Sequence, residues 1–452
     1  MSKQVTIEEN PLPRVLVISP ALSFTGNNGC IYGPLFQGWP HDRIAQIHTD
    51  AQEPSPELCT RSWRLSLDDV PLDARFRPLL TRLFHSGKSG CTAGQGVVVG
   101  GLEHLSFQAR AVTKAHLLIR AWMDLVPFRL SRDFWEWVHD FRPEVIFSST
   151  GSIRMIRLTS SLARRRCLPI IADFRDDYPN ALYRESLLAA FPRRVLMGQL
   201  ARMMALSPII TAGSEPLGKL YSKRYGIPSS TFIPPVQHSE IHAGQAPAPV
   251  SHSEGIKFVY VGGLHLNRWQ QLIEIGTILA KVQTQSKAEL VIYAPESHLR
   301  QHQAALLAQP CIRVAGALKQ DAVFPILRQA DVLVHVESFD PQIQRYTWMS
   351  VSTKIPQYMA AGRPILAYGP AALASLQHIE ETSCGIVVGH RDSAELLAAV
   401  RRLQDEPGLR GCLGKKGWQA AQDKHDADRE RERFRQLARA IAVSGRAPKP
   451  RK

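Results

Sequence analysis

Residues Ser350–Gly369 read SVSTKIPQYMAAGRPILAYG, and this stretch decides the fold of the chain. Ser352 and Thr353 carry hydroxyl groups that can cap a helix, and Pro356 stands where a missing N–H costs a helix little. Gly362 is expected to end the helix, because glycine readily adopts the left-handed backbone found just after helices. The first half of the stretch therefore predicts a short helix.

A buried strand is expected next. Pro364 to Tyr368 is an apolar run of strand length closed by glycine and proline, which is typical of a parallel sheet. Helix followed by strand is one turn of an α/β fold. The start of the helix combines free N–H groups, the hydroxyls of Ser352 and Thr353, and Lys354. Such a helix start suits an anion, for which a nucleotide diphosphate is the leading candidate.

The segment Lys-x-x-Gln-Tyr-Met-Ala-Ala-Gly-x-Pro, which begins at Lys354, resembles the donor site of GT-B glycosyltransferases, in particular of family 4. In that family a Glu usually stands at the position of Gln357 and accepts hydrogen bonds from the ribose of the nucleotide sugar. Gln357 can still accept through its amide oxygen. The family's earlier Glu would fall on Met349, so this chain has neither acid.

The resemblance implies an α/β protein of the GT-B fold. Two Rossmann-like domains would turn their parallel sheets toward a cleft, and a C-terminal helix would cross back to the first domain. A chain of 452 residues is long for one domain, so length also favours two.

Five segments are expected along the chain. Residues 1–236 would form the N-terminal, acceptor-side domain, and 237–256, rich in Ala, Pro, Ser and His, a linker. Residues 257–416 would form the C-terminal domain that binds the nucleotide sugar. The charged stretch 417–442 would be the helix that packs back, and 443–452 a disordered basic tail.

The formal net charge of +15 is unusual and points to an acidic partner. Candidates are an anionic membrane surface, nucleic acid or a phosphorylated substrate, and a solvated basic surface with no dedicated partner is the alternative. Nucleic acid is disfavoured, because the basic residues are scattered and no recognition motif accompanies them.

Location follows from what the sequence lacks. The seven cysteines form no C-x-x-C pair, which favours free thiols in a reducing cytosol. The polar first ten residues, with Glu8 and Glu9, do not resemble a secretory signal, and no apolar run approaches the roughly 20 residues of a membrane span. We expect a cytoplasmic protein whose membrane contact, at the inner face of the plasma membrane, is peripheral.

In the first domain, Arg14 to Ser19 is a β-branched strand followed by an expected turn, Pro20 to Gly29. The turn contains Gly26-Asn27-Asn28-Gly29, which resembles the opening of one bacterial branch of these transferases, where it faces the cleft. Gly26 and Gly29 are therefore candidate ligand contacts at a carboxyl edge of the sheet, and a purely structural turn is the alternative.

Further along, Gly96 to Gly101 is a brief strand or a turn. Ala115 to Trp137 predicts two helices broken near Pro127, with aromatic residues among arginines. Those aromatics would either face the core or contact a membrane surface.

An acidic segment follows the expected strand Leu168 to Ala172. Asp173, Asp176 and Asp177 stand at its end, where a core role is not expected for acids. The segment resembles an acidic D-D-aromatic-P motif of the same branch. Asp173 would loosely replace a family His that contacts the transferred sugar, and a loop anchored by side-chain hydrogen bonds is the alternative.

The second domain opens with strand Phe258 to Val261, the turn Gly262-Gly263 and helix Trp269 to Val282. Strand, glycines and helix bring backbone close to a phosphate. Arg268, at the helix entrance, is a candidate diphosphate ligand because it keeps its charge and binds bidentately. A solvated surface arginine is the alternative.

Other candidates line the same edge. His265 and Asn267 could touch the sugar or the base, and Gly316 begins the segment where family 4 enzymes hold the nucleobase. Glu337 to Tyr346 is expected to be a loop lining the cleft. Further strands are expected at 289–293, 312–315, 332–336, 365–368 and 385–388.

We therefore predict a glycosyltransferase that uses a UDP- or GDP-linked sugar and a glycan or lipid-linked acceptor in bacterial surface polysaccharide synthesis. Arg268 and Lys354 would stabilise the leaving diphosphate, with Asp173 near the sugar and no cofactor or metal. The Asp-x-Asp at Asp426 and Asp428 lies in an expected charged helix and is interpreted as accidental. The family implies retention of anomeric configuration.

Two alternatives stay open. Sugar-nucleotide 2-epimerases share the GT-B architecture. A nonenzymatic protein could also keep the fold with a lapsed donor site, marked by Met349 and Gln357, and act in a polysaccharide assembly complex.

Overall fold

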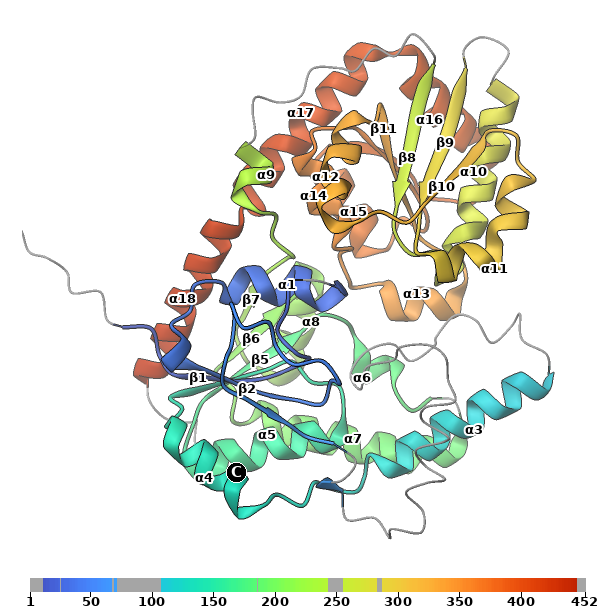
Figure 1. Cartoon of the computed structure of the whole chain (residues 1–452). Helices are drawn as coiled ribbons and strands as arrows, with labels where there is room; N and C mark the ends of the chain where they lie inside the picture. Colours follow the sequence, from blue (N-terminus) through green and yellow to red (C-terminus); the bar gives the residue numbers. More distant parts are fainter. Residues whose placement is uncertain are drawn as a thin grey trace, which may run out of the picture.

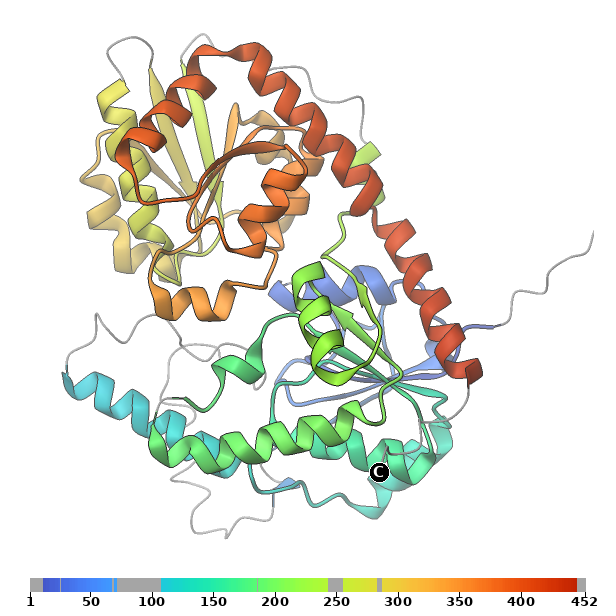
Figure 2. The ribbon, with the colours of Figure 1, turned by 180° about the vertical axis from the view of Figure 1, so that it is seen from behind.

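The computed structural model describes residues 11–24, 26–66, 69–70, 107–184, 186–242, 255–282 and 287–444. Figure 1 shows two α/β domains, each built on one sheet with helices on both faces, and Figure 2 shows them from behind. The element expected at 96–101, most of the linker and nearly all of the basic tail lie outside the described residues.

The first domain is built on a seven-stranded parallel sheet with strand order β3-β2-β1-β4-β5-β6-β7. Its central strands are short, apolar and wholly buried, as expected for strands covered on both faces. The strands are β1 Val15–Ile18, β2 Ile44–His48, β3 Ser62–Arg64, β4 Val145–Ser148, β5 Ile170–Phe174, β6 Ile209–Ala212 and β7 Ser229–Thr231.

Serine side chains cap the N-termini of three helices in the first domain. Ser131, Ser152 and Ser214 each accept a hydrogen bond from the backbone N–H three residues on. The helices are α1 Gly26–Phe36, α3 Phe107–Met123, α4 Arg132–Phe141, α5 Ile153–Arg166, α6 Tyr178–Ala181, α7 Ala190–Met204 and α8 Glu215–Tyr225, with 3-10 turns η1 His41–Arg43 and η3 Leu187–Ala189. Helices α3 and α4 confirm the pair expected around Pro127.

The prediction of a turn from Pro20 to Gly29 is partly wrong, because helix α1 begins at Gly26. Glycine and asparagine are poor helix formers, so packing decides here. Tyr32 and Phe36 of α1 pack edge-on against Phe147 of β4, with ring centroids 5.8 and 5.3 Å apart. Gly33 allows the close approach, since a Cβ there would lie 2.6 Å from the carbonyl oxygen of Ser23.

The aromatics of α3 and α4 divide between core and surface. Phe134 and Phe141 are buried, and Trp137 packs against the same core. Trp122 at the end of α3 is 45% exposed. The core interpretation is therefore correct for α4, and α3 presents an aromatic side chain to solvent.

The second domain is built on a six-stranded parallel sheet with order β10-β9-β8-β11-β12-β13. All five pairings between neighbouring strands are parallel. The strands are β8 Ile256–Val261, β9 Ala288–Tyr293, β10 Ile312–Gly316, β11 Val332–Val336, β12 Ile365–Tyr368 and β13 Gly385–Val388.

The covering helices are α10 Arg268–Val282, α11 Glu296–Leu307, α12 Gln320–Gln329, α13 Pro341–Thr347, α14 Lys354–Ala360, α15 Ala374–Glu381 and α16 Ser393–Asp405. The loop expected at Glu337 to Tyr346 is wrong beyond Asp340, because α13 forms there. Asp340 caps this helix by accepting the N–H of Gln342 at 2.8 Å.

The stretch that predicted the fold forms α14 and β12. Gly362 has φ +66° and follows the helix, as expected. The prediction that a hydroxyl group caps α14 is wrong, because Thr353 has helical backbone angles and its side chain makes no capping hydrogen bond. The N–H of Ser352 instead binds Oγ of Ser375 at 3.0 Å.

The helix expected at 417–442 is two helices, α17 Pro407–Lys424 and α18 Ala427–Ser444. Asp426 separates them and caps α18 by accepting from the N–H groups of Asp428 and Arg429. The break lies beside the interdomain crossing, where Val236 pairs with Asp426 and the short helix α9 His238–His242 follows.

Helix α18 packs on the first domain, as the fold predicts, and Figures 1 and 2 show it (red) along that domain's edge. Phe434 is 1% exposed and lies among first-domain rings, with centroids 5.2 Å from Phe36, 5.6 Å from Phe147 and 5.7 Å from Phe232. This helix supplies part of the first domain's core.

Candidate donor site at the carboxyl edge of the second sheet

Ionic and aromatic side chains from separate segments meet where strands of the second sheet end. Arg268 begins α10, Lys354 begins α14, and Glu337 follows β11 directly. Tyr260 comes from β8 and His265 from the turn after it. Ligands bind at this edge of open parallel sheets, because all the strand ends and helix starts collect there.

Arg268 and Glu337 form a buried ion pair. Nη2 of Arg268 lies 3.0 and 3.1 Å from the two carboxylate oxygens, and the residues are 7% and 2% exposed. Burial alone would raise the pKa of Glu337, but Arg268 and then His335, whose Nε2 is 3.3 Å away, lower it to about 2. Glu337 is therefore a carboxylate at any physiological pH.

Lys354 lies next to this pair. Its Nζ is 3.1 Å from the hydroxyl of Tyr260 and 4.4 Å from the centre of that ring. Burial and then the nearby guanidinium of Arg268 lower the pKa of Lys354 well below its usual value. The guanidinium of Arg268 thus disfavours the ammonium form of Lys354, and an anion bound beside both side chains would favour that form.

Gly262 makes room for Lys354. Its φ is +150°, and a Cβ built on it would collide with Nζ and Cε of Lys354. Gly263 likewise lies against the ring of His265. Only glycine satisfies both the backbone angle and the contact at position 262, so the glycine turn serves the lysine as well as the strand–helix connection.

His265 and Asn267 complete the turn. Burial lowers the pKa of His265 to about 4, and Arg268 and Lys354 add to the effect. The ring is therefore neutral near pH 7 and can donate one hydrogen bond and accept another. Leu266 and Asn267 have φ of +60° and +57°, so two consecutive residues adopt the uncommon left-handed conformation beside the ionic cluster.

The remaining second-domain candidates surround the cluster more loosely. Ser352, Thr353 and Gln357 are half-buried on or just before α14. Gly316 ends β10 with φ +87°, and a Cβ there would meet nothing within 4 Å. The segment after β10 therefore borders open space, which suits a flat ring held by backbone groups.

Asp173 is hydrogen-bonded within its own domain, which favours the alternative of a segment anchored by side-chain hydrogen bonds. Asp173 is 3% exposed and accepts hydrogen bonds from Tyr32 at 2.9 Å and Thr211 at 2.8 Å. Arg175 contacts both of its carboxylate oxygens, through Nε at 2.9 Å to Oδ2 and through Nη2 at 2.8 Å to Oδ1. Because its lone pairs are occupied within its own domain, Asp173 positions Arg175 and Tyr32. The expectation that no acid here serves the core was wrong, since Asp173 and Asp177 are buried but hydrogen-bonded.

The other two acids of the motif link the domains. Asp176 accepts from Ser350 at 2.5 Å and Tyr346 at 3.5 Å, and Asp177 accepts from the indole of Trp348 at 3.2 Å. The sequence gives little indication of this pairing, because the partners lie far apart along the chain. An aromatic and hydroxyl-rich stretch before α14 was the only signal.

Met349 belongs to the same contact. Its carbonyl accepts from Ser214 of the first domain, and its side chain packs against that domain's core. At the position of the family's first acid, this chain therefore has an apolar interdomain contact. Glu337 supplies the acid near the cations instead, and sequence reasoning included it only as the start of a lining loop.

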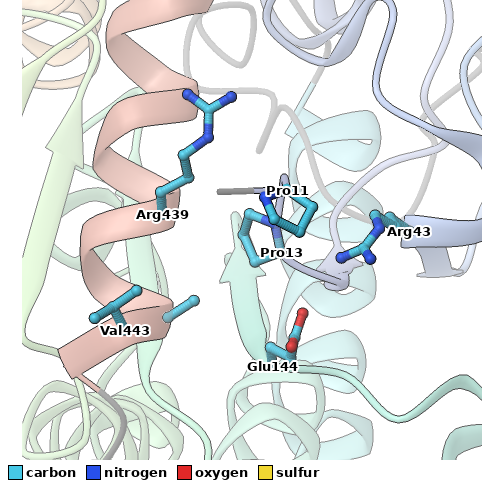
Figure 3. A pocket seen from close by; sticks show the side chains of 7 residues that line it. Pro11, Pro13, Arg43, Glu144, Arg439 and Val443 are labelled. Carbon is cyan, nitrogen blue, oxygen red and sulfur yellow. The ribbon is translucent and has the colours of Figure 1, made fainter. Parts of the chain in front are cut away.

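A separate hollow lies in the first domain, at the edge of its sheet where the strands begin. Figure 3 shows Pro11, Pro13, Arg43, Glu144, Arg439 and Val443 around it, where α18 passes the start of β1. None of the predicted site residues lines it, and its walls carry both signs of charge.

Helix α1 brings Gly26 and Gly29 to its first turn. Asp426 and Asp428 lie with His238 so that their ligand atoms are within 4.8 Å of one another, but Asp426 caps α18 with one oxygen and binds His238 with the other at 2.7 Å. Within the described residues, no helix is long and apolar enough to cross a membrane.

Two parallel-sheet domains with a C-terminal helix that crosses back onto the first domain define the GT-B fold. Residues 255–406, which make up most of the second domain, match the family described as glycosyl transferases group 1. No curated protein sequence matches the chain.

Solved structures of the same fold cover nearly the whole chain at low identity. The sucrose-phosphate synthase of Thermosynechococcus elongatus is 14% identical with a TM-score of 0.58, covering 95% of this chain and 99% of its own. An alpha,alpha-trehalose-phosphate synthase from Burkholderia vietnamiensis is 12% identical, with a TM-score of 0.60 and coverage of 95% and 99%. HepE from Anabaena is 11% identical, with a TM-score of 0.57 and coverage of 95% and 99%.

Proposed function

We propose that this enzyme transfers a sugar from a nucleotide-diphosphate donor, with Arg268 and Lys354 binding the diphosphate. The observation that carries the proposal is that two basic side chains begin helices at the carboxyl edge of this sheet and are electrostatically coupled, in a segment that matches the group 1 family. Departure of the nucleotide leaves negative charge on the diphosphate, and fixed cations stabilise that charge in the transition state.

The donor must compete with Glu337 for Arg268. Both oxygens of Glu337 already lie within 3.1 Å of Nη2, so a diphosphate either displaces the carboxylate or uses the remaining donors of the guanidinium. Nε of Arg268 is buried without a hydrogen-bond partner among the described residues. A phosphate oxygen at that edge would satisfy it.

The anion also restores the charge of Lys354. Burial and Arg268 disfavour the ammonium form, and a diphosphate beside Lys354 favours it. We therefore expect binding of UDP to raise the pKa of Lys354, and so to take up protons at any pH between the pKa values of Lys354 in the unliganded and the bound enzyme. Calorimetry in two buffers of different ionisation enthalpy measures this uptake directly.

A uridine nucleotide is the favoured donor. Three proteins of this fold support it by their ligands or reactions: the E. coli trehalose-6-phosphate protein is bound with UDP-2-fluoro glucose, HepE is in complex with UDP and glucose, and the B. vietnamiensis enzyme is UDP-forming. Gln357 would accept from the ribose, His265 and Asn267 would contact the sugar or base, and Gly316 would face the nucleobase. GDP is the alternative.

Retention of anomeric configuration, without a metal, completes the proposed reaction. A trehalose-6-phosphate synthase of the same fold performs glycosyl transfer with retention, which supports it. A glycan or lipid-linked acceptor of bacterial surface polysaccharide synthesis would bind on the first domain. We place the enzyme in the cytoplasm, at the inner face of the plasma membrane, where its +15 charge suits anionic lipid.

The test is a screen of UDP- and GDP-sugars by calorimetry, followed by product analysis with and without glycan acceptors. We expect binding of at least one UDP-sugar and acceptor-dependent release of UDP. Conversion of the donor without acceptor would indicate an epimerase. Binding of no nucleotide sugar would refute the proposed donor site.

A further inference from the structure

We propose that an apolar face on the first domain docks the protein onto an anionic bilayer. This docking face consists of Ile119, Trp122, Leu187, Leu188 and Phe191, from α3, η3 and the start of α7. They are 36%, 45%, 94%, 64% and 57% exposed, respectively, and five of the eight exposed large apolar residues among the described residues are therefore gathered here. Contiguous exposed apolar groups mark interaction sites, whereas scattered ones are ordinary.

Contacts of Trp122 join the three elements that carry the face. Trp122 stacks on Phe191 with ring centroids 5.7 Å apart and an interplanar angle of 22°. The indole N–H of Trp122 donates to the carbonyl of Leu188 at 3.2 Å, which fixes η3 against α3. The face is thus held in place by its own contacts, and Figures 1 and 2 both show α3 beside the start of α7 at the outer edge of the domain.

The core does not need these residues. Ala121 on α3 is fully buried, Leu118 and Leu125 pack against the core, and the buried residues of α7 include Leu196, Leu200 and Met204. Each helix therefore has an inner apolar face that stabilises the domain and a second apolar surface directed outward. Helices that serve only the core are polar on the outside.

Charge selects the partner. Arg184 and Arg194, both exposed, lie within three residues of the face in sequence, and half-exposed Arg120 adjoins Ile119. In residues 107–132 and 186–214 the only acid is Asp124, which is buried and accepts from Tyr183 and the N–H of Ile153. Glu185 lies outside the described residues.

Exposed aromatic and leucine side chains with arginines close by in sequence fit the headgroup region of an anionic membrane, where rings and leucines enter and arginines meet lipid phosphate. The three arginines near the face in sequence, and the lack of an exposed acid in residues 107–132 and 186–214, favour an anionic bilayer over a protein partner. The assignment gives a location to the peripheral contact proposed above and is independent of the donor chemistry.

Vesicle flotation tests the docking face. The full-length protein is mixed with phosphatidylcholine vesicles that contain or lack phosphatidylglycerol. We expect binding to the anionic vesicles that weakens on raising salt, because the arginine contribution is screened and the apolar one is not. Leu187→Gln with Leu188→Gln should lower partitioning by roughly tenfold or more. Arg184→Gln and Arg194→Gln should each lower it about fivefold on anionic vesicles only.

Matched controls lie on the second domain. Leu307 on α11 is 51% exposed, and Arg401 on α16 is exposed. Leu307→Gln and Arg401→Gln should bind vesicles like the unmodified protein. Equal losses in control and docking-face variants, or full binding by Leu187→Gln with Leu188→Gln, would overturn the proposal.

Two more measurements distinguish the bilayer from a second copy of the chain, and the docking face from the donor site. Self-association in lipid-free sedimentation, abolished by Leu187→Gln with Leu188→Gln, would show that a second copy covers the face and would also overturn the proposal. UDP binding should be unchanged in every docking-face variant, so a failed donor site would appear as lost UDP binding with vesicle binding intact.

Discussion

Removing Glu337's charge should make the enzyme bind its donor more tightly while making the unliganded protein less stable. The carboxylate holds Arg268 at 3.0 and 3.1 Å in a site where both residues are nearly inaccessible to water. In Glu337→Gln the amide oxygen can still accept from Arg268, so we expect a stability loss of roughly 1–3 kcal/mol. The guanidinium then lacks a counter-charge, which a bound diphosphate would supply.

Arg268→Ala should behave differently. It leaves Glu337 as an uncompensated buried charge, which typically costs about 3–5 kcal/mol, or roughly 6–20 °C in Tm for a domain of this size. It should also lower kcat/KM by about 2–4 kcal/mol, roughly 30- to 1,000-fold, through loss of a fixed cation. The buried ion pair thus makes this arginine important for folding as well as for the donor.

Thermal unfolding with and without UDP distinguishes the two. UDP should raise the Tm of Glu337→Gln by more than that of the unmodified protein and should barely move that of Arg268→Ala. The double variant Arg268→Met with Glu337→Leu should recover most of the stability without recovering UDP binding. If UDP shifts Glu337→Gln less than the unmodified protein, Glu337 does not compete with the donor, and the reasoning fails.

Substitutions at four other positions test the rest of the candidate site and the pH dependence of stability. Lys354→Ala should lower kcat/KM in steady-state assays by the equivalent of about 2–4 kcal/mol of transition-state stabilisation. The Tm should change little, because the partner of Lys354, Tyr260, keeps a neutral hydroxyl. Full activity of this variant would show that Lys354 is not part of the donor site. Gly262→Ala should lower kcat/KM by a similar factor by displacing Lys354, and a rate equal to that of the unmodified enzyme would contradict the collision seen at that position. Gln357→Ala should raise the donor KM about tenfold with kcat nearly unchanged, and Gln357→Glu should tighten donor binding; the reverse order of KM values would refute the ribose contact. Burial holds the pKa of His378 at about 4, against about 6.5 when unfolded, beside His425 at 3.0 Å. As the pH falls, the unfolded chain protonates this histidine before the folded protein does, so its contribution to stability is full above about pH 6.5 and is lost as the pH drops toward 4. His378→Gln should therefore show a smaller loss of Tm between pH 7 and pH 5 than the unmodified protein. An equal loss of Tm would exclude this histidine as the cause.

The second sheet could be predicted almost residue by residue. Strands β11, β12 and β13 have the predicted bounds, since each is a short apolar run closed by Gly, Pro or a charge. Burial on both faces leaves a continuous hydrophobic signal that local patterns do not contradict. Helix α1 was missed because the packing of Tyr32 and Phe36 on β4 outweighs the turn propensity of its first residues.

The site was predicted in part, and the limit is physical. Arg268, Lys354 and Gly262 were found from strand, turn and helix patterns, which are local. Glu337 pairs with Arg268 across the sheet, and Asp176 pairs with Ser350 across the domains. Such partners are set by how strands are ordered and how domains meet, neither of which leaves a periodic trace in the sequence.

Phe434 has a consequence for how the chain is made. It lies near the end of the chain, yet its ring completes the cluster around Phe36 and Phe147 in the first domain. During synthesis, that domain leaves the ribosome long before the residue that seals it. We expect the nascent first domain to stay incompletely packed, with apolar rings accessible to chaperones, until α18 emerges and packs against it.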